Sequence, residues 1–196
     1  MKLLLATHNE HKRREFARLL SASVGEDGWE VQALPATAIL PPEEGHTFAE
    51  NALVKARAAA RATGSVSIAD DSGIEATALG GAPGVRSARY AGEDASDAQN
   101  LNKLLREAPA GSPLEYVCAI AYVEPRDGGE RVFEGRCAGR VAQTPRGQRG
   151  FGYDPAFVPD DGPGALTMAE LSDEQKDAIS HRGRAARALV QWLRAG

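Results

Sequence analysis

The chain has 196 residues, with 23 basic and 27 acidic side chains and a formal net charge of −4. This length can bury a substantial core in one large domain or two small lobes. The balanced charge gives no support for a nucleic-acid surface, and no apolar run is long enough to cross a membrane.

Two further features favour a cytoplasmic protein. The N-terminus, Met1-Lys-Leu-Leu-Leu-Ala-Thr7, becomes polar too soon for a secretory signal. Cys118 and Cys137 each lie inside an apolar strand pattern. They are therefore expected to be small core residues in a reducing compartment, not disulfide partners or metal ligands.

The first element is a predicted strand over residues 2–6, followed by a polar turn and a helix whose apolar residues recur from Phe16. Thr7 and Asn9 are candidate caps for that helix. The unpaired N–H groups of the first turn form a ready anion site, and Lys12 lies there although a cation is unfavourable at that position. This placement suggests an anionic ligand; a solvated lysine on a capped surface helix is about equally well supported.

A second strand is predicted over 30–34, before a proline-rich stretch over 35–45. A long alanine-rich helix then runs from Thr47, the predicted N-cap, to about Thr63. Asn51 and Lys55 lie one turn apart on it and point the same way. Lys55 can reach a phosphate from there, although a lysine extended along an amphipathic helix is the commoner case.

The stretch Ser65-Val-Ser-Ile-Ala-Asp-Asp-Ser-Gly73 predicts a short buried strand that Gly73 ends, with Asp70 and Asp71 at its tip. Adjacent strand residues point to opposite faces, so the two carboxylates are not expected to act as one clamp. We expect one to meet a divalent metal or water and the other to hold the turn. On this stretch alone, a purely local Asx-turn is the better-supported alternative.

The middle of the chain predicts further strands and a helix. A strand is expected at 74–79, a turn at 80–84 that is only weak evidence for a phosphate loop, a loop at 87–92 and a helix at 96–107. Strands at 115–124 and 130–141 are expected to pair as a hairpin around 125–129, with the second strand half-exposed.

A glycine- and arginine-rich loop over 144–150 precedes Phe151-Gly-Tyr-Asp154. An exposed Phe151 beside Asp154 is suited to stacking on a nucleobase and reading its edge. The alternative is that Phe151 packs into the core under the loop.

The last helical region begins with Ser172 as the predicted N-cap. Lys176 and His181 would point in different directions on one continuous helix. If both reach a ligand, the helix must break near Ser180. Alternating strands and helices with a central hairpin predict an α/β fold with a mixed sheet.

Taken together, these motifs resemble the inosine/xanthosine triphosphate pyrophosphatase family over nearly the whole chain. Each motif is weak alone, but their order and spacing are a strong signal. The motifs are Ala6-Thr-His-Asn-Glu-His-Lys12, Thr47-Phe-Ala-Glu-Asn-Ala-Leu-Val-Lys55, Ala69-Asp-Asp-Ser-Gly73, Pro83-Gly-Val-Arg-Ser-Ala-Arg-Tyr90, Gly150-Phe-Gly-Tyr-Asp-Pro155, Ala169-Glu-Leu171 and Ser180-His-Arg182.

The resemblance implies one nucleotide pyrophosphatase domain over 1–196, with an elongated, two-lobed α/β fold. Its mixed, strongly twisted sheet would be flanked by helices, with a cleft between the lobes. Such proteins are usually homodimers. They use Mg²⁺ to split ITP, dITP and XTP between the α- and β-phosphates, which yields the monophosphate and pyrophosphate and removes these nucleotides from the pool.

The resemblance also implies roles for individual residues. Asp71 would be the catalytic base and, with Glu43, a magnesium ligand. The triphosphate would be bound by Thr7, His8, Asn9, Glu10, His11, Lys12 and Lys55, and Ser72 would touch the substrate. The purine would be bound by Phe151, Gly152, Tyr153, Asp154, Lys176, His181 and Arg182.

Two positions depart from the family pattern. The acidic segment reads Glu43-Glu-Gly45, where the pattern more often has one residue more, so Glu43 and Glu44 both remain candidate ligands. Arg86 stands where an aromatic residue is common. Other functions to weigh are a Maf-like pyrophosphatase for pyrimidine or modified nucleotides, and a nucleotide-binding regulator without turnover.

Overall fold

The structure is a computed structural model that describes residues 2–24, 29–35, 37–126 and 128–195. Its six-stranded sheet has the order β2-β1-β3-β4-β5-β6. The strands are β1 (Lys2–Leu5), β2 (Glu30–Ala33), β3 (Ser67–Ala76), β4 (Pro113–Val123), β5 (Glu130–Val141) and β6 (Phe157–Pro159). β1 pairs in parallel with β2 and β3, whereas β5 and β6 are antiparallel, so the predicted mixed α/β sheet is confirmed.

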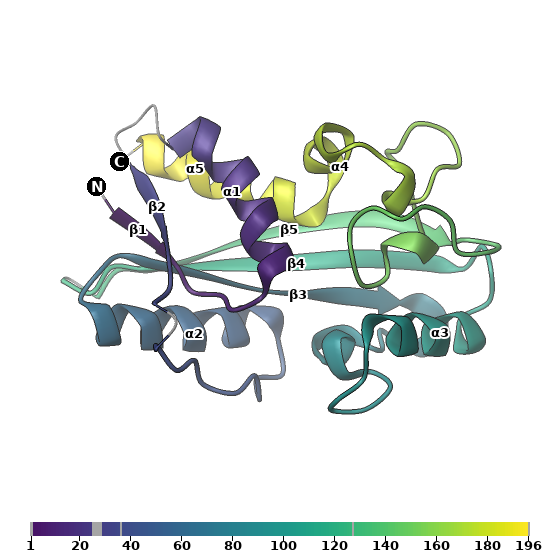
Figure 1. The fold of residues 1–196 in the computed structure, drawn as a ribbon, viewed down its shortest axis with the longest axis horizontal. Coiled ribbons are helices and arrows are strands. Elements are labelled where there is room, and N and C mark those ends of the chain that lie inside the picture. Colours follow the sequence, from purple (N-terminus) through teal and green to yellow (C-terminus); the bar gives the residue numbers. More distant parts are fainter. Residues whose placement is uncertain (1, 25–28, 36, 127, 196) are drawn as a thin grey trace. The chain divides into compact units, whose positions relative to one another are not determined.

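Five α-helices accompany these strands in the described part of the chain (Figure 1). They are α1 (Glu10–Val24), α2 (Phe48–Thr63), α3 (Asp97–Glu107), α4 (Asp173–Ile179) and α5 (His181–Ala195). The chain divides into two compact units, which are described separately. The first unit comprises 1–71, 118–135 and 182–196; the second comprises 72–117 and 136–181. The single-domain assignment and the cleft stay predictions.

In the first unit, α1 and α5 lie together on one face of the sheet and α2 lies on the other (Figure 1). Phe16 and Leu20 of α1 and Leu189 of α5 pack on Ile68 and Ile120 of the strands. All five side chains are fully buried. This cluster fixes the helix faces from which the polar side chains of the first unit project.

The second unit has its own apolar core. Ile74 of β3, Leu104 of α3 and Phe157 of β6 pack there with Tyr116 and Tyr153. Helix α3 begins with a capping box, in which Ser96 accepts from the backbone N–H of the third helical residue. This cap fixes the start of the helix whose inner face carries Leu104.

The prediction for the central strand was wrong in one respect. β3 continues without interruption from Ser67 to Ala76, so Gly73 does not end it and no separate strand covers 74–79. Gly73 is not among the described glycines with positive φ, and Ile74 beyond it is fully buried. Burial of the residues around Gly73 therefore keeps the chain extended, and residues 77–79 form a 3₁₀ turn instead. Asp70 and Asp71 lie within the strand, and neither holds a turn.

Several local predictions are confirmed. Thr47 and Glu50 form the capping box of α2, and α4 ends at Ile179, so that Ser180 separates it from α5. β5 alternates buried and exposed residues as expected. Residues 84–89, however, form a 3₁₀ helix that covers part of the predicted loop. One residue of the predicted 125–129 turn, residue 127, lies outside the described residues.

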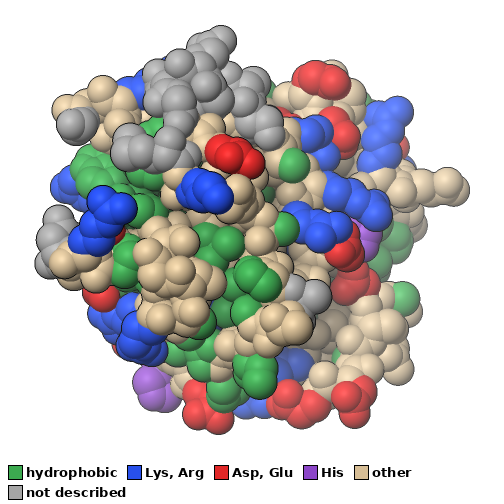
Figure 2. All heavy atoms as spheres, turned by 60° about the vertical axis from the view of Figure 1, so that its left-hand side comes forward, with side chains coloured by type: hydrophobic (Ala, Val, Ile, Leu, Met, Phe, Trp, Pro, Cys, Tyr) green, Lys and Arg blue, Asp and Glu red, His purple; other side chains and the backbone are tan. Residues whose placement is uncertain are grey.

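Within the described residues, no helix is both long and apolar enough to span a membrane. Figure 2 shows one face of the molecule, on which basic and acidic side chains are interspersed among apolar ones. The described residues on this face therefore form no single-sign charge field of the kind that attracts a polyanion.

Candidate functional site

Asp70 and Asp71 form the centre of a charged cluster in the first unit. They are adjacent in β3, and their carboxylates meet different helices. Asp70 pairs with Lys12 of α1 and Arg182 of α5, whereas Asp71 accepts from Asn51 of α2. These helices cover opposite faces of the sheet, so the two carboxylates point to opposite faces, as expected for adjacent strand residues (Figure 1).

The Asp70 carboxylate is buried among positive charges. Its Oδ2 lies 3.0 Å from Lys12 Nζ and 3.3 Å from Arg182 Nη2. Burial alone would raise its pKa, but the charges of Lys12 and Arg182 outweigh burial and hold the pKa of Asp70 well below its usual range. Asp70 is therefore ionised at neutral pH. The anionic partner expected for Lys12 is present within the protein itself.

Arg182 joins this cluster to Glu15 of α1. Its Nη1 donates to Glu15 Oε2, and both side chains are buried. Although burial opposes the charge, the carboxylates of Glu15 and Asp70 raise the pKa of Arg182. The structure thus places Arg182 in a buried ionic network of the first unit. Its expected place at the purine edge stays a prediction.

Asp71 has a different environment. Its Oδ2 accepts a 2.8 Å hydrogen bond from Asn51 Nδ2, while Asn51 Oδ1 accepts from the Gly45 N–H at 2.7 Å. Burial raises the pKa of Asp71, and the nearby carboxylate of Glu43 adds to the effect against the opposing charge of Lys12. A carboxylate with a raised pKa is a stronger base, which suits proton abstraction from water.

Lys55 of α2 lies between acceptors on the same side as Asn51. Its Nζ donates to Glu43 Oε1 and, at 2.5 Å, to the backbone carbonyl of Asp70. Burial works against its charge, yet the carboxylates of Asp70 and Glu43 raise the pKa of Lys55. A buried lysine held charged in this way supplies positive charge for a phosphate group.

These donors suit a hard divalent cation. The Glu43 carboxylate lies close enough to raise the pKa of Asp71, and Asp70 Oδ1 is buried without a hydrogen-bond partner in the described structure. Oxygen ligands are those that Mg²⁺ prefers, and it needs only one or two carboxylates alongside phosphate oxygens and waters. Across the ranges that the structure describes, no three His, Cys, Asp or Glu side chains form a complete protein cage.

In the polar turn over residues 7–12, the side chains of Thr7 and Asn9 accept hydrogen bonds from backbone N–H groups. Asn9 Oδ1 caps the helix by accepting from the N–H groups of His11 and Lys12 at 2.9 and 3.1 Å. Thr7 Oγ1 accepts from Asn9, so the N-cap role falls to Asn9. The backbone donors of the first turn thus already have one internal acceptor. The remaining members contact nearby groups: His8 lies 3.1 Å from the Ala38 carbonyl, and Glu10 pairs with Arg13 on the surface.

The second unit holds a separate group around Asp154. Its Oδ2 accepts from Lys176 Nζ at 2.6 Å and from the Phe151 N–H at 3.0 Å. Lys176 Nζ also lies 5.4 Å from the centre of the half-buried Phe151 ring. One buried carboxylate therefore fixes both a cationic donor and the backbone of an aromatic residue.

The loop that carries Phe151 is anchored from two further directions. The Gly152 N–H donates to Asp97 Oδ2 at 2.9 Å, and the Tyr153 hydroxyl donates to the Ser87 carbonyl at 2.7 Å. Gly150 has φ +73°, and a Cβ atom there would lie 2.0 Å from Asp154 Oδ2. Only glycine combines this backbone conformation with the close approach of the carboxylate.

His181 is the other expected purine-edge residue in the second unit. Its ring stacks on Tyr116 of β4, with centroids 4.5 Å apart and an interplanar angle of 7°. The helix break at Ser180 allows Lys176 and His181 to leave from separate helices. Ser72 is half-buried in β3, and exposed Arg86 pairs with Glu93, so neither position gains an assigned role.

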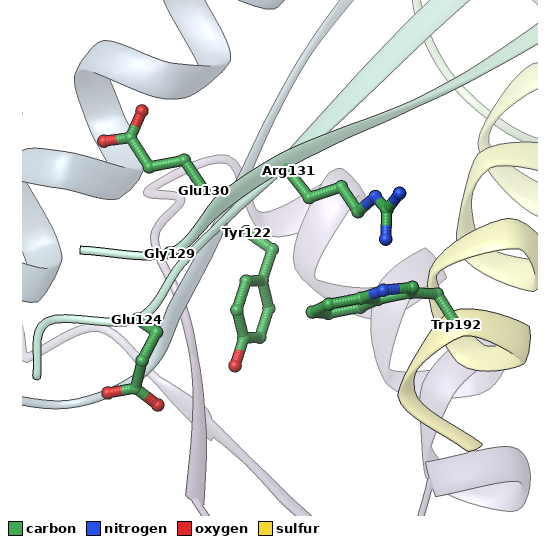
Figure 3. A pocket seen from close by; sticks show the side chains of 6 residues that line it. All are labelled: Tyr122, Glu124, Gly129, Glu130, Arg131 and Trp192. Atoms are coloured by element: carbon green, nitrogen blue, oxygen red, sulfur yellow. The ribbon is translucent and has the colours of Figure 1, made fainter. Parts of the chain in front are cut away.

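A pocket of about 400 Å³ lies elsewhere in the first unit. Figure 3 shows Trp192 and Tyr122 as its aromatic walls, with Arg131 above the indole ring at 5.4 Å from its centroid. Its other lining residues are Glu124, Gly129 and Glu130. None of these residues belongs to the predicted site.

Three structural partners escaped the sequence reasoning: Glu15, Asp97 and Tyr116. Asp97 is an acidic residue in the first turn of α3, and Tyr116 is one of many buried residues in β4, so neither carries a local signal. Glu15 offered a weak signal, because it is an acid next to Phe16 on the buried side of α1. An acid on an apolar helix face requires a buried cation, but its partner is 167 residues away.

Comparisons with known proteins agree with the motif pattern. The Ham1 family profile matches residues 3–192. Proteins named dITP/XTP pyrophosphatase from Cutibacterium acnes and Mycolicibacterium paratuberculosis are 46% and 48% identical to this chain; the alignments cover 96% and 97% of it and 94% and 95% of those proteins. A solved HAM1 protein from Coxiella burnetii, 37% identical, superposes with a TM-score of 0.87 and full coverage of both chains.

Proposed function

This chain belongs to the Ham1 family, and we propose on that basis that it hydrolyses non-canonical purine nucleoside triphosphates. The substrates are dITP, XTP and ITP, and the products are the monophosphate and pyrophosphate. The reaction removes these nucleotides from the pool. The family resemblance inferred from the seven motifs is confirmed.

The observation that carries this proposal is a pair of adjacent carboxylates in β3 whose pKa values are shifted in opposite directions. Asp70 is held ionised by Lys12 and Arg182, whereas burial and Glu43 raise the pKa of Asp71. One carboxylate thus balances the buried cations, and its neighbour is left as a base. Two nearby acids whose environments shift their pKa values apart are typical of acid–base catalysis.

In this proposal the cluster of the first unit binds the triphosphate. Lys12 and Lys55 supply positive charge to its oxygens, and the polar turn over residues 7–11 contributes donors. Asp71, oriented by Asn51, accepts a proton from the water that attacks between the α- and β-phosphates. Asn51 keeps the carboxylate in one orientation, so the base does not need to reorganise during the reaction.

We propose Mg²⁺ as the cofactor, held by Glu43 and Asp71. The contact between Glu43 and Lys55 favours Glu43 over exposed Glu44, because it places Glu43 on the Asp71 side of α2. When bound, the ion neutralises charge on the phosphate oxygens. Besides the proposed Mg²⁺, Lys55 is a second positive partner for Glu43. The ion pair with Lys55 limits where the Glu43 carboxylate can lie.

The group in the second unit is proposed to bind the purine. Phe151 stacks on the base, and Asp154 holds Lys176 as a donor to a 6-keto oxygen, with His181 close by. Adenine carries a 6-amino group, which would leave that donor unpaired. Such mismatches at a buried polar site are strongly rejected. Gly152 and Tyr153 contribute through the anchored loop, and Ser72 is proposed to touch substrate.

We also propose that the protein is located in the cytoplasm and forms a homodimer. Two buried, unbridged cysteines support a reducing compartment. The dimer rests on the family resemblance alone.

The test is pyrophosphate release from dITP, XTP and dATP by purified protein in the presence of Mg²⁺. The wild type is expected to hydrolyse dITP and XTP far faster than dATP. Asp71→Asn should lose turnover by roughly three orders of magnitude, because it removes the base while keeping the side-chain shape. Binding of a non-hydrolysable dITP analogue, measured by calorimetry, should persist.

Asp94→Asn is the matched control, since Asp94 lies on an exposed loop of the second unit. It should retain wild-type rates. A wild-type protein that binds dITP but releases no pyrophosphate would identify a nucleotide-binding regulator. Preferential hydrolysis of pyrimidine triphosphates would favour the Maf-like alternative instead.

A further inference from the structure

Tyr116 connects two of the residues proposed to bind the purine, although none of the seven motifs includes it. It lies in β4, is only 6% exposed, and packs in the core of the second unit. A purely apolar side chain could fill that core position. The hydroxyl group therefore needs a separate explanation.

The hydroxyl of Tyr116 donates to Asp154 Oδ1 at 3.0 Å. The other carboxylate oxygen, Oδ2, accepts from Lys176 Nζ and the Phe151 N–H. Asp154 is thus held at both oxygens by three separate segments of the second unit. Since a hydrogen bond to a charged acceptor is directional, Tyr116 limits rotation of the carboxylate about its Cβ–Cγ bond.

The ring of Tyr116 has a second contact. It stacks nearly parallel on His181, while its neighbour Phe157 lies 4.5 Å away at a 41° tilt. This packing holds the His181 imidazole in one plane. Through its hydroxyl and its ring, one side chain therefore fixes an acceptor, a cationic donor and an imidazole.

We propose that Tyr116 is a positioning residue for purine recognition, acting through Asp154 and His181. The inference rests on the proposed function, and it adds a specificity-determining residue to it. Tyr116 fixes where Lys176 Nζ presents its proton to the base. Both of the residues through which it acts are assigned to the base, so it affects binding of the base and not the chemical step.

Tyr116→Phe is the direct test, because it removes the hydroxyl and keeps the ring that stacks on His181. We expect KM for dITP to rise roughly tenfold with kcat within about twofold of wild type. The ratio of kcat/KM for dITP to that for dATP should fall several-fold, since Lys176 is less well oriented. Tyr116→Leu, which also removes the ring, should lower that ratio further.

Tyr122→Phe is the matched control. Tyr122 lies six residues along the same strand, faces the same side of β4 and is 7% exposed. It should leave KM and the dITP/dATP ratio unchanged. Thermal unfolding of all three variants shows whether they are folded, and loss of folded protein alone would lower kcat for every nucleotide in equal proportion.

The outcomes separate the two proposals. If wild-type protein hydrolyses dITP and Tyr116→Phe behaves like Tyr122→Phe, the role of Tyr116 is refuted and the proposed function stands. The role is equally refuted if kcat falls while the nucleotide ratio is unchanged. If wild-type protein hydrolyses no purine triphosphate, the proposed function fails and the inference fails with it.

Discussion

Asp70 and Asp71 show how far the surroundings of a residue determine its chemistry. Both are aspartates in one strand, and both are buried. Two positive charges outweigh burial and lower the pKa of Asp70, whereas burial and a nearby carboxylate raise that of Asp71. The difference lies in which helix each side chain meets, because adjacent residues of a strand face opposite sides.

Replacement of Asp70 by asparagine should destabilise the protein strongly. Lys12 and Arg182 would lose a shared counter-charge in a buried setting, a loss of about 3–5 kcal/mol in the free energy of unfolding. Urea denaturation at pH 7 measures it. Asp160→Asn is the control, because Asp160 pairs with Arg140 on the surface, where such pairs contribute about 1 kcal/mol or less.

The stability difference between wild type and Asp70→Asn should depend on pH, because folding lowers the pKa of Asp70. The ionised form of Asp70 is favoured by folding, so its contribution is fully present above the unfolded-state pKa of about 3.9 and is lost as the pH falls toward the folded-state value. The stability gap between wild type and Asp70→Asn should be constant from pH 7 to about pH 5 and shrink below about pH 4. A gap that widens on acidification would contradict the ionised assignment.

The choice between Glu43 and Glu44 as metal ligand can be decided at the same scale. Glu43 contacts Lys55 and influences Asp71, whereas Glu44 is exposed. Glu43→Gln should raise the Mg²⁺ concentration for half-maximal activity by roughly tenfold or more, since Mg²⁺ is held by only one or two carboxylates. Glu44→Gln should leave it unchanged. The reverse result would assign the ligand to Glu44.

At the scale of the element, the loop over 150–153 depends on one glycine. Gly150→Ala combines a left-handed backbone, which costs about 1–2 kcal/mol for a non-glycine residue, with a collision against Asp154 Oδ2. We expect this variant to be less stable and to bind dITP more weakly, because the Asp154–Lys176 pair must move. Chemical denaturation and KM for dITP measure the two effects.

Gly164→Ala is the matched control for the loop. Gly164 has φ +69° and open space around its Cβ position, so it carries the backbone penalty alone. The free energy of unfolding of Gly164→Ala should fall only by the backbone penalty of about 1–2 kcal/mol. Its KM for dITP should not change. Equal effects in the two variants would show that the contact with Asp154 has no role in binding.

Elements with local signals were predictable from the sequence. The capping box at Thr47 marks the start of α2, and the break at Ser180 was expected if Lys176 and His181 both reach a ligand. The continuity of β3 was not predictable, because it depends on the buried surroundings of Gly73. Local rules describe a glycine's freedom, but tertiary pairing decides whether the chain uses it.

At the scale of the whole molecule, the motifs identified the family and most of the residues that gather in each unit. They could not show which partner each residue takes. Lys12 was expected to meet an anionic ligand and meets Asp70, while Arg182 was expected near the purine and meets Glu15. Such pairings join residues up to 167 positions apart, and composition and spacing carry no information about them.

The junction at Ser180 also limits how the chain can change in length. His181 belongs to the second unit and stacks on Tyr116, whereas the next residue, Arg182, belongs to the first and pairs with Glu15 and Asp70. One residue inserted between His181 and Arg182 would turn the following side chains of α5 by about 100°. Either the imidazole or the guanidinium would then lose its partners. We therefore expect length variation among related chains to fall in the surface loops and not at this point.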